Sequence, residues 1–298
     1  MTTATTAAGI SHFVIDRYPP VLSSVYALAF GSGGIGLFAA LAGKHVAVSA
    51  IPMLGIVVVT IFADLLIMRV LDDIRDRDYD RIANPERAVV SGAVAVRDLS
   101  ILTAVCVTVI VVANLSFITG MVIIVGQLLY TAALMATGQR FPATRGDNLV
   151  LNVLLGFPVQ LLLYVYLLAA FTKIANGAPS AVAVGLGMLI LTLCAGQVEF
   201  GKKLVRRPAA GERSYTNSLG YLITLLLTLG TGPLAAALFA IAAPVSPVCK
   251  LFVALPAVGV TGFAIGYLLH KENRWPAAIS TLGQLSTLIV FAVVGTVG

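Results

Sequence analysis

Asp72-Asp73-Ile74-Arg75-Asp76-Arg77-Asp78-Tyr79-Asp80 is the stretch around which this chain is organised, because it holds five of the thirteen acidic residues. Residues on a helix advance by about 100° per step. A continuous helix here would place four carboxylates within an arc of about 100°, those of Asp72, Asp73, Asp76 and Asp80. Asp78 would point away from this arc. Carboxylates so spaced repel one another, and Arg69, one turn earlier, cannot offset all four.

Clustered carboxylates with open positions are typical ligands of hard divalent cations. Magnesium bound by carboxylates usually completes its coordination shell with water and substrate phosphate oxygens. The stretch therefore predicts a Mg²⁺ site for a phosphorylated or diphosphorylated substrate. The alternative is a solvated charged loop that joins two other elements.

The composition excludes a soluble protein. Hydrophobic residues make up 59% of the chain, charged residues only 11%, and the mean hydropathy is +0.99. Soluble domains carry about 25% charged residues. The pI near 9.4 is typical of cytoplasmic lysine and arginine in a membrane protein, so we expect no nucleic-acid partner. The predicted fold class is all-α and integral to the lipid bilayer.

Nine apolar runs are long enough to span a bilayer, which takes about 20 residues. We predict that residues 1–298 form a single polytopic membrane domain and that residues 1–15 form a disordered tail. The predicted spans are 21–42, 48–71, 98–117, 119–137, 149–172, 180–200, 217–241, 247–269 and 276–297.

The positive charges predict the orientation. With the N-terminus in the cytoplasm, sixteen of the nineteen lysines and arginines fall in inward segments, and only Lys44, Lys173 and Lys250 face outward. Such asymmetry is the signature of cytoplasmic loops. We expect nine transmembrane helices in a bundle, with the C-terminus outside. The active-site mouth, formed by loops 2–3 and 6–7, would face the cytoplasm.

A second group of charged residues lies at the end of the sixth predicted span. On a helix ended by Pro208, one carboxylate and three cations would share a face, namely Glu199, Lys202, Lys203 and Arg206. Lysine and arginine complement diphosphate oxygens. The alternative is the ordinary positive decoration of a cytoplasmic loop, although a carboxylate near the membrane boundary is costly unless it is paired or functional.

Two further polar residues are candidates for the same region. Asp64 lies inside the second span, about two turns before Asp72, where it could line a polar cavity or pair with another helix. Asn148, at the start of the fifth span, could reach the mouth.

The chain resembles the UbiA superfamily of intramembrane prenyltransferases over essentially its whole length. The family's first motif, Asn-Asp-x-x-Asp-x-x-x-Asp, corresponds here to Asp72-Asp73-x-x-Asp76-x-x-x-Asp80, followed downstream by Arg87 and Gly92. Arg17 before Pro19-Pro20 also looks like the start of the family's sequence. The second motif, usually Asp-x-x-x-Asp, departs from the pattern, because Glu199 is followed four residues later by Lys203.

The resemblance implies a Mg²⁺-dependent enzyme that ionises a prenyl diphosphate inside a membrane cavity. The implied metal ligands are Asp72, Asp73, Asp76, Asp80 and Glu199. The implied diphosphate-binding residues are Arg87, Asn148, Glu199, Lys202, Lys203 and Arg206. Within these sets, the implied catalytic residues are Asp73, Asp76, Asp80 and Lys203.

The step after ionisation is left open by the sequence. Prenyl transfer to an aromatic or other lipophilic acceptor is favoured, because most of the superfamily does this. Cyclisation of the prenyl chain without an acceptor, as in UbiA-type terpene cyclases, is the alternative, supported by the altered second motif. A membrane transporter also fits the composition, but transporters place ionisable residues near the bilayer midplane, and here only Asp64 is deep.

Overall fold

The computed structural model describes residues 6–140, 149–209 and 211–297. Within these residues the regular structure is helical, joined by loops and turns, and the one β-type pairing is an isolated bridge between Val205 and Arg274. The helices are α1 (Thr6–Arg17), α2 (Pro20–Leu41), η1 (Val48–Ala50), α3 (Ile51–Arg75), α4 (Arg77–Ala83), α5 (Ala88–Ser91), α6 (Val96–Ala113), α7 (Ile118–Arg140), α8 (Leu149–Ile174), α9 (Ala181–Lys202), α10 (Tyr215–Leu219), α11 (Tyr221–Ala242), α12 (Pro247–Leu269) and α13 (Ala277–Val297).

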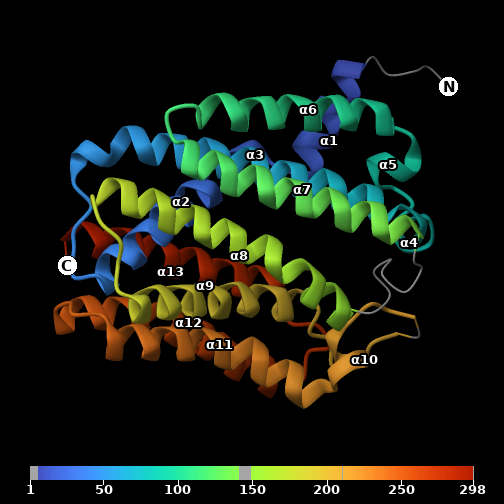
Figure 1. The fold of residues 1–298 in the computed structure, drawn as a ribbon. Coiled ribbons are helices and arrows are strands. Elements are labelled where there is room, and N and C mark those ends of the chain that lie inside the picture. Colours follow the sequence, from blue (N-terminus) through green and yellow to red (C-terminus); the bar gives the residue numbers. More distant parts are fainter. Residues whose placement is uncertain (1–5, 141–148, 210, 298) are drawn as a thin grey trace.

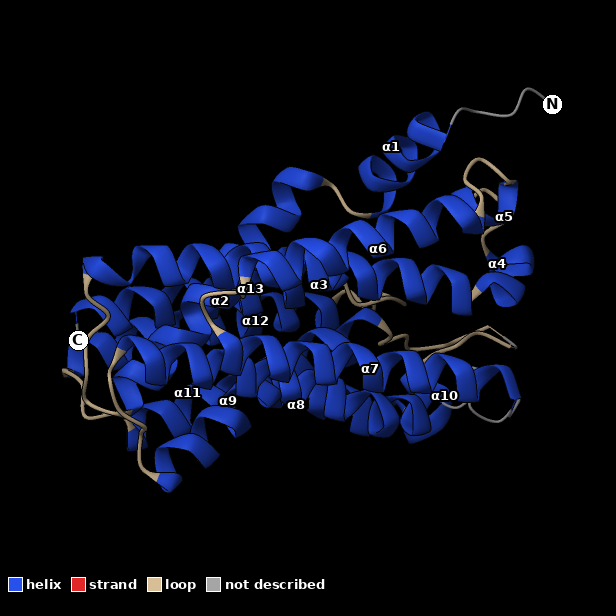
Figure 2. Cartoon of the chain, turned by 45° about the horizontal axis from the view of Figure 1, so that its top comes forward, coloured by secondary structure: helices blue, strands red, loops and turns tan. Residues whose placement is uncertain are grey.

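The long helices lie side by side in one bundle (Figure 1). Nine helices of the described part are long and apolar enough to cross a membrane, and their bounds match the predicted spans closely. The all-α membrane fold is therefore confirmed. The short helices α4, α5 and α10 gather at one end, which we call the loop-rich end, while the last helix ends at the opposite end (Figures 1 and 2).

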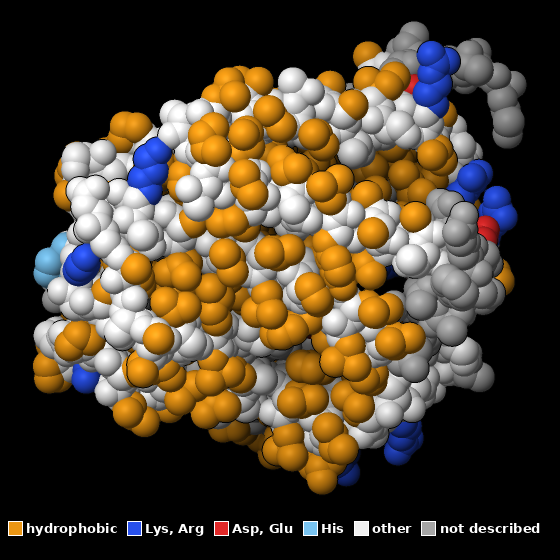
Figure 3. All heavy atoms as spheres, viewed as in Figure 1, with side chains coloured by type: hydrophobic (Ala, Val, Ile, Leu, Met, Phe, Trp, Pro, Cys, Tyr) orange, Lys and Arg blue, Asp and Glu red, His pale blue; other side chains and the backbone are white. Residues whose placement is uncertain are grey.

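The outer flank of the bundle is apolar. Figure 3 shows hydrophobic side chains over most of the visible flank, with Lys and Arg gathered toward its ends. Among the exposed residues are Val182, Leu222, Ile241 and Leu269. A soluble protein rarely exposes so much contiguous apolar surface, whereas lipid tails solvate it without cost.

The first spanning helix, α2, lies in the interior, where it packs against α3, α8, α9 and α13. Its closest partner is α13. A Cβ at Gly33 would overlap the backbone of Leu288, and one at Gly36 would overlap the backbone of Phe291. Gly295 of α13 lies directly against Gly36 in the same way. Small residues let membrane helices approach to backbone contact, and here they join the first span to the last.

The expectation of a disordered tail over residues 1–15 is wrong from Thr6 onward, where α1 forms. This helix packs against α6. Its Phe13 side chain is fully buried, and Gly9 lies close to the backbone of Ala93 and Val94. Burial of one aromatic side chain against the bundle explains why a small, polar segment is ordered.

The acidic stretch is not one continuous helix, contrary to our expectation. Helix α3 ends at Arg75, and α4 begins at Arg77, after Asp76 at φ −85° and ψ 4°. The chain therefore turns in the middle of the motif, and Asp80 does not continue the α3 face. Repulsion between carboxylates one turn apart disfavours a continuous helix here.

Two predicted boundaries in the second half are also wrong. Helix α9 ends at Lys202 rather than at Pro208, because the chain leaves the helix to form the Val205–Arg274 bridge. The seventh span begins at Tyr221 rather than at 217, because Gly220 at φ 83° separates the short α10 from α11. A positive φ is accessible to glycine at little cost, so this glycine marks a break.

Candidate active site

The two charged regions found in the sequence meet at the loop-rich end. We call residues 72–87 the acidic segment and residues 199–215 the basic segment. Arg213 Nη1 of the basic segment lies 3.3 Å from Asp76 Oδ1 of the acidic segment. The Arg213 guanidinium also lies over the Tyr79 ring, 4.0 Å from its centroid. This bridge holds together two segments that are more than a hundred residues apart in the sequence.

Asp73, in the last turns of α3, is buried against arginines. Its carboxylate accepts two hydrogen bonds from Arg17, at 2.8 Å from Nε and 3.0 Å from Nη2. Arg69 Nε lies 3.7 Å away on the other side. The hydrogen bond to Asp73 raises the pKa of the Arg17 guanidinium above its usual value. This paired geometry ties α1 to the acidic segment.

Asp80, on α4, is paired in a similar way. Its carboxylate is buried and accepts hydrogen bonds from Arg87 and, at 2.8 Å, from Asn84 Nδ2. Arg87 stands immediately before α5, in the segment that returns toward the bundle. The pair therefore closes the loop between α4 and α5, and Arg87 is engaged with Asp80 rather than open to solvent.

Asp72 and Asp76 are the more accessible carboxylates of the motif. Their side chains are 49% and 25% exposed. Both contact Arg75, whose Nη2 lies 2.9 Å from Asp72 Oδ1 and whose Nε lies 3.4 Å from Asp76 Oδ1. Arg75 therefore bridges the two more accessible carboxylates of the motif, and the charge of Glu199 reaches it more weakly from the basic segment.

Asp78 differs from the other four carboxylates of the stretch. Its side chain is 83% exposed, and it pairs with Arg81, one turn away at 3.1 Å. It is therefore the most exposed carboxylate of the stretch, and no contact joins it to the basic segment among the described residues.

Glu199 is the carboxylate of the basic segment, near the end of α9. Its Oε1 accepts hydrogen bonds from Lys203 Nζ at 3.1 Å and from the Tyr215 hydroxyl at 2.7 Å. The Lys203 ammonium also lies over the Tyr215 ring, 5.2 Å from its centroid. Burial and the neighbouring Glu199 charge raise the pKa of Tyr215. The phenol therefore stays protonated and keeps donating to Glu199.

The structure separates Arg206 from this group, contrary to the expectation that it shares a helical face with Glu199. Because α9 ends at Lys202, Arg206 turns toward α11 and α12, where its guanidinium lies 5.5 Å from the centroids of both the Tyr221 and Tyr267 rings. Lys202 is exposed at the last position of α9. Asn148, predicted to reach the mouth, lies outside the described residues.

The contacts identify several residues that the sequence alone did not assign to the site. They are Arg17, Asn84, Arg75, Arg213 and Tyr215. Arg17 carried one signal, its position before Pro19-Pro20. For Tyr215 the sequence carried no signal, because its contact with Glu199 depends on the course of the loop after α9.

The arrangement of the carboxylates decides which of them are able to hold a metal ion. Among the described residues, no group of three or more His, Cys, Asp or Glu side chains is gathered as metal ligands. Magnesium commonly needs only one or two protein carboxylates, with water and phosphate oxygens as its other ligands. Asp72 and Asp76 fit that requirement by chemistry and exposure, whereas Asp73 and Asp80 are buried against arginines.

Polar groups also lie inside the bundle, away from the charged end. Asp64 of α3 and Gln127 of α7 are both buried, and Asp64 Oδ1 and both amide atoms of Gln127 lack a hydrogen-bond partner among the described residues. Asn114, after α6, donates to Thr60 Oγ1 at 2.7 Å and accepts from the Tyr166 hydroxyl at 2.9 Å. Asp64 therefore lies in a partly polar interior.

The comparisons with known proteins concern the fold alone. No protein family and no curated protein matches this sequence. A solved structure described as "Structural and mechanistic insights into the biosynthesis of Digeranylgeranylglyceryl phosphate synthase in membranes" superposes with a TM-score of 0.51 at 15% identity. The match covers 96% of this chain and 98% of that one. The chain therefore shares its fold with that structure, which agrees with the membrane-embedded helical fold that the sequence resemblance implies.

Proposed function

We propose that this protein ionises a prenyl diphosphate at its loop-rich end and transfers the prenyl group to a lipophilic acceptor. The observation that carries the proposal is the meeting of the acidic and basic segments at one end of an apolar bundle, through the Arg213–Asp76 and Arg213–Tyr79 contacts. The fold shared with a digeranylgeranylglyceryl phosphate synthase supports the same reaction class.

In this proposal, Asp72 and Asp76 hold Mg²⁺ together with the diphosphate. When bound there, Mg²⁺ supplies Lewis-acid stabilisation of the charge that develops on the diphosphate oxygens. Arg75 and Arg213 then exchange their carboxylate contacts for diphosphate oxygens. Asp73 and Asp80 contribute by fixing Arg17 and Arg87 at the edge of the site through their ion pairs.

The basic segment receives the leaving group. The bond between the prenyl C1 and the diphosphate oxygen breaks, and its electron pair leaves with the diphosphate. Lys203 and exposed Lys202 are the cations of this segment placed to stabilise that charge. Glu199 and Tyr215 position Lys203, because Glu199 binds its ammonium and the Tyr215 ring lies beneath it.

The apolar interior receives the prenyl chain. An allylic cation reacts with water unless water is excluded, and closely packed helices exclude it. The acceptor then attacks C1 and loses a proton. Because the neighbour's name describes a digeranylgeranylglyceryl phosphate, a prenylated glyceryl phosphate is an acceptor class to test beside aromatic acceptors.

Cyclisation without an acceptor is the second candidate, and Asp64 favours it. A buried carboxylate with an unpartnered oxygen, within the apolar helices rather than at the mouth, could remove the proton that ends a cyclisation. Prenyl transfer from the mouth does not require a base at that depth.

The positive charges support a cytoplasmic site. The loop-rich end carries the acidic and basic segments, and α1 stands at that end while α13 ends at the opposite one (Figure 1). In this orientation the N-terminus is cytoplasmic, the C-terminus is outside and the site faces the cytoplasm.

The test compares Asp76→Asn with Asp78→Asn in purified protein reconstituted in nanodiscs. Both changes remove one negative charge from the same stretch, but only Asp76 touches Arg75 and Arg213. With Mg²⁺ and prenyl diphosphates of increasing length, we expect Asp76→Asn to lower diphosphate release by about 100-fold or more. The Asp78→Asn variant should stay within about twofold of the original rate.

Products are analysed by mass spectrometry with no acceptor, with aromatic acceptors and with a prenylated glyceryl phosphate. Prenylated acceptor supports transfer, whereas cyclic hydrocarbon formed without acceptor supports the second candidate. Equal diphosphate release by the two Asn variants would contradict a role for Asp76, and no release from any prenyl diphosphate would overturn the proposed reaction.

A further inference from the structure

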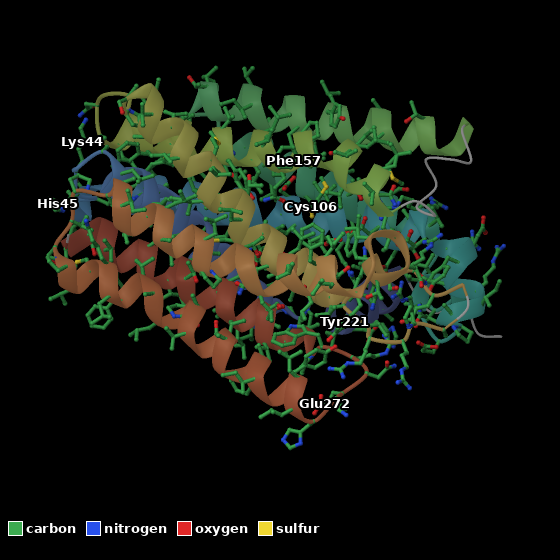
Figure 4. The ribbon with its side chains drawn as sticks, turned by 90° about the horizontal axis from the view of Figure 1, so that it is seen from below. Lys44, His45, Cys106, Phe157, Tyr221 and Glu272 are labelled. Atoms are coloured by element: carbon green, nitrogen blue, oxygen red, sulfur yellow. The ribbon has the colours of Figure 1, made fainter. Side chains whose placement is uncertain are left out.

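A second charged site lies beside the candidate active site, between the basic segment and the connection from α12 to α13. It is a cavity of about 440 Å³ lined by Arg206, Arg207, Lys271 and Asn273. In Figure 4, Tyr221 and Glu272 mark the α11 and α12–α13 side of the bundle, far from Lys44 and His45 at the opposite end. None of the residues that contact Asp72 or Asp76 lines this cavity.

Hydrogen bonds join the two loops that carry the residues of the cavity wall. Val205 pairs with Arg274, and the Arg206 amide donates to the Asn273 carbonyl at 2.7 Å. The Arg207 amide donates to Asn273 Oδ1 at 2.9 Å. These bonds hold the two loops together, so that their cations are positioned before a ligand binds.

The positive charge in this cavity is not neutralised by the protein. No carboxylate of the described residues lies within ion-pair distance of Arg206, Arg207 or Lys271. Glu212, on the neighbouring loop, is already bound to Arg274 at 2.6 Å. Three cations around one cavity repel one another, and an anion removes that repulsion.

Arg206 is held beside the cavity by aromatic groups rather than by a carboxylate. Its guanidinium lies 5.5 Å from the centroid of the Tyr221 ring and 5.5 Å from that of the Tyr267 ring. Arg206 Nε and both tyrosine hydroxyls are buried, and the three groups lie close enough to interact with one another. These contacts fix the guanidinium but do not neutralise its charge.

Lys271, on the cavity wall, has an unusual backbone conformation. Its backbone adopts φ 53°, a conformation that is uncommon for residues other than glycine. The strained turn places a cation, rather than a glycine, on the cavity wall.

The surroundings match the boundary between lipid and water. Leu222, Leu268 and Leu269, near the ends of α11 and α12, expose apolar side chains. Tyr221 and Tyr267 flank Arg206 of the cavity wall, and Trp275 packs against Tyr267. Tyr and Trp are typical of membrane interfaces. Basic pockets at this level of a membrane protein are sites for anionic head groups.

We propose that this cavity binds the phosphate group of an anionic phospholipid, with Arg206, Arg207 and Lys271 on the phosphate oxygens and the acyl chains along Leu222 and Leu269. The site is independent of the proposed prenyl-transfer function, because its ligand is not a substrate and its binding is measured without turnover.

The test measures lipid retention by native mass spectrometry on the full chain, taken from nanodiscs that contain phosphatidic acid and phosphatidylcholine. We expect the protein to retain phosphatidic acid preferentially. Each cation near an anionic surface contributes about fivefold in affinity. Arg206→Gln with Arg207→Gln should therefore lower retention roughly twentyfold. The matched control is Arg77→Gln with Arg97→Gln, which removes two exposed cations outside the cavity.

A second variant guards against misfolding. Lys271→Asn removes a cation at a position where asparagine tolerates the left-handed backbone, so it should keep the melting temperature and lower retention about fivefold. Retention equal to the control pair in both cavity variants would overturn the proposal.

The source of the phosphate is distinguished by competition. Inorganic phosphate and soluble glycerol phosphate are added at millimolar concentration before the lipid is measured. Persistent retention of phosphatidic acid supports a lipid head group. Displacement of the lipid by the soluble anions, lost in the cavity variants, overturns the lipid assignment in favour of a soluble phosphate ligand.

Discussion

The acidic and basic segments handle charge in opposite ways. In the acidic segment, each of Asp72, Asp73, Asp76 and Asp80 already contacts an arginine. In the basic segment, Glu199 binds Lys203, while Lys202 and Arg206 have no carboxylate partner in the part of the chain that the structure describes. The carboxylates of the first segment are paired with arginines from the segment itself, from α1 and from the basic segment, whereas the second segment keeps an excess of positive charge.

Under the proposed function, this difference favours binding of a diphosphate and a metal ion together. A diphosphate would be attracted first by the basic segment, where Lys202 has no carboxylate contact to break. Asp72 and Asp76 would become free to hold a metal ion as Arg75 and Arg213 exchange their carboxylate contacts for diphosphate oxygens. The predictions below test this division between a structural and a substrate-binding set of charges.

The largest effect is a loss of thermal stability, and it is expected at Asp73, a buried carboxylate of the acidic segment. Arg17→Met leaves the Asp73 carboxylate, only 4% exposed, without its hydrogen-bonded partner. Breaking a buried ion pair by removing one member costs about 3 kcal/mol or more. We expect a clear loss of thermal stability in detergent, measured by the melting temperature.

The double variant Arg17→Met with Asp73→Leu is the control, because apolar replacement of a whole buried pair is often neutral. It should recover most of the lost stability. If Arg17→Met alone melts like the original protein, the Asp73–Arg17 pair does not anchor α1, and the structural role given to the acidic segment fails.

A second test concerns the substrate-binding set. Lys203→Ala removes a cation that is held ready by Glu199 and Tyr215. Loss of one charge-stabilising donor to a leaving group lowers turnover by about 100-fold. We expect this fall in kcat/KM for prenyl diphosphate, with an unchanged melting temperature. The matched control is Lys250→Ala, on the outer side in the predicted orientation. If the two variants lower kcat/KM equally, Lys203 has no specific role in stabilising the leaving diphosphate.

The smallest effect is expected at Tyr215. Tyr215→Phe keeps the ring beneath the Lys203 ammonium but removes the 2.7 Å hydrogen bond to Glu199. A hydrogen bond to a charged group contributes about 1.5–3 kcal/mol, and part of this is recovered by the Lys203 contact that remains. We expect kcat/KM to fall about fivefold. Glu199→Gln should lower it further, since Lys203 then loses its charged partner. A Tyr215→Phe effect as large as that of Lys203→Ala would contradict a positioning role.

The sequence predicted the spans well because hydropathy alone decides them. A run of apolar residues crosses the membrane whatever its neighbours are, so the bounds of the long helices agree with the prediction within a few residues. The sequence also predicted that the Asp72–Asp80 stretch and the end of α9 face each other, and the contact of Arg213, in the loop after α9, with Asp76 brings these regions together.

The pairing of charges could not be predicted in the same way. Arg17 meets Asp73 only because α1 packs against α6, and Arg213 meets Asp76 only because the loop after α9 folds back. The predicted position of Arg206 on the Glu199 face of the helix is wrong for a related reason. Pro208 predicts that the helix continues to residue 207, but the chain leaves α9 after Lys202 to form a backbone bridge between Val205 and Arg274. Long-range contacts of this kind leave no periodic signal in the sequence.

The glycine contact between α2 and α13 has a consequence for biogenesis. Helix α2 has the lowest hydropathy of the nine spanning helices of the described residues and the largest buried share, yet its glycine face is covered by α13, which is synthesised after the other eight. At about 5–20 residues per second, translation from one to the other takes on the order of ten seconds to a minute. During that interval the glycine face of α2, the least apolar span, is not covered by α13. Truncation within α13 should therefore leave the other spans inserted but this face of α2 exposed. The cell's quality-control proteases would then degrade the truncated chain.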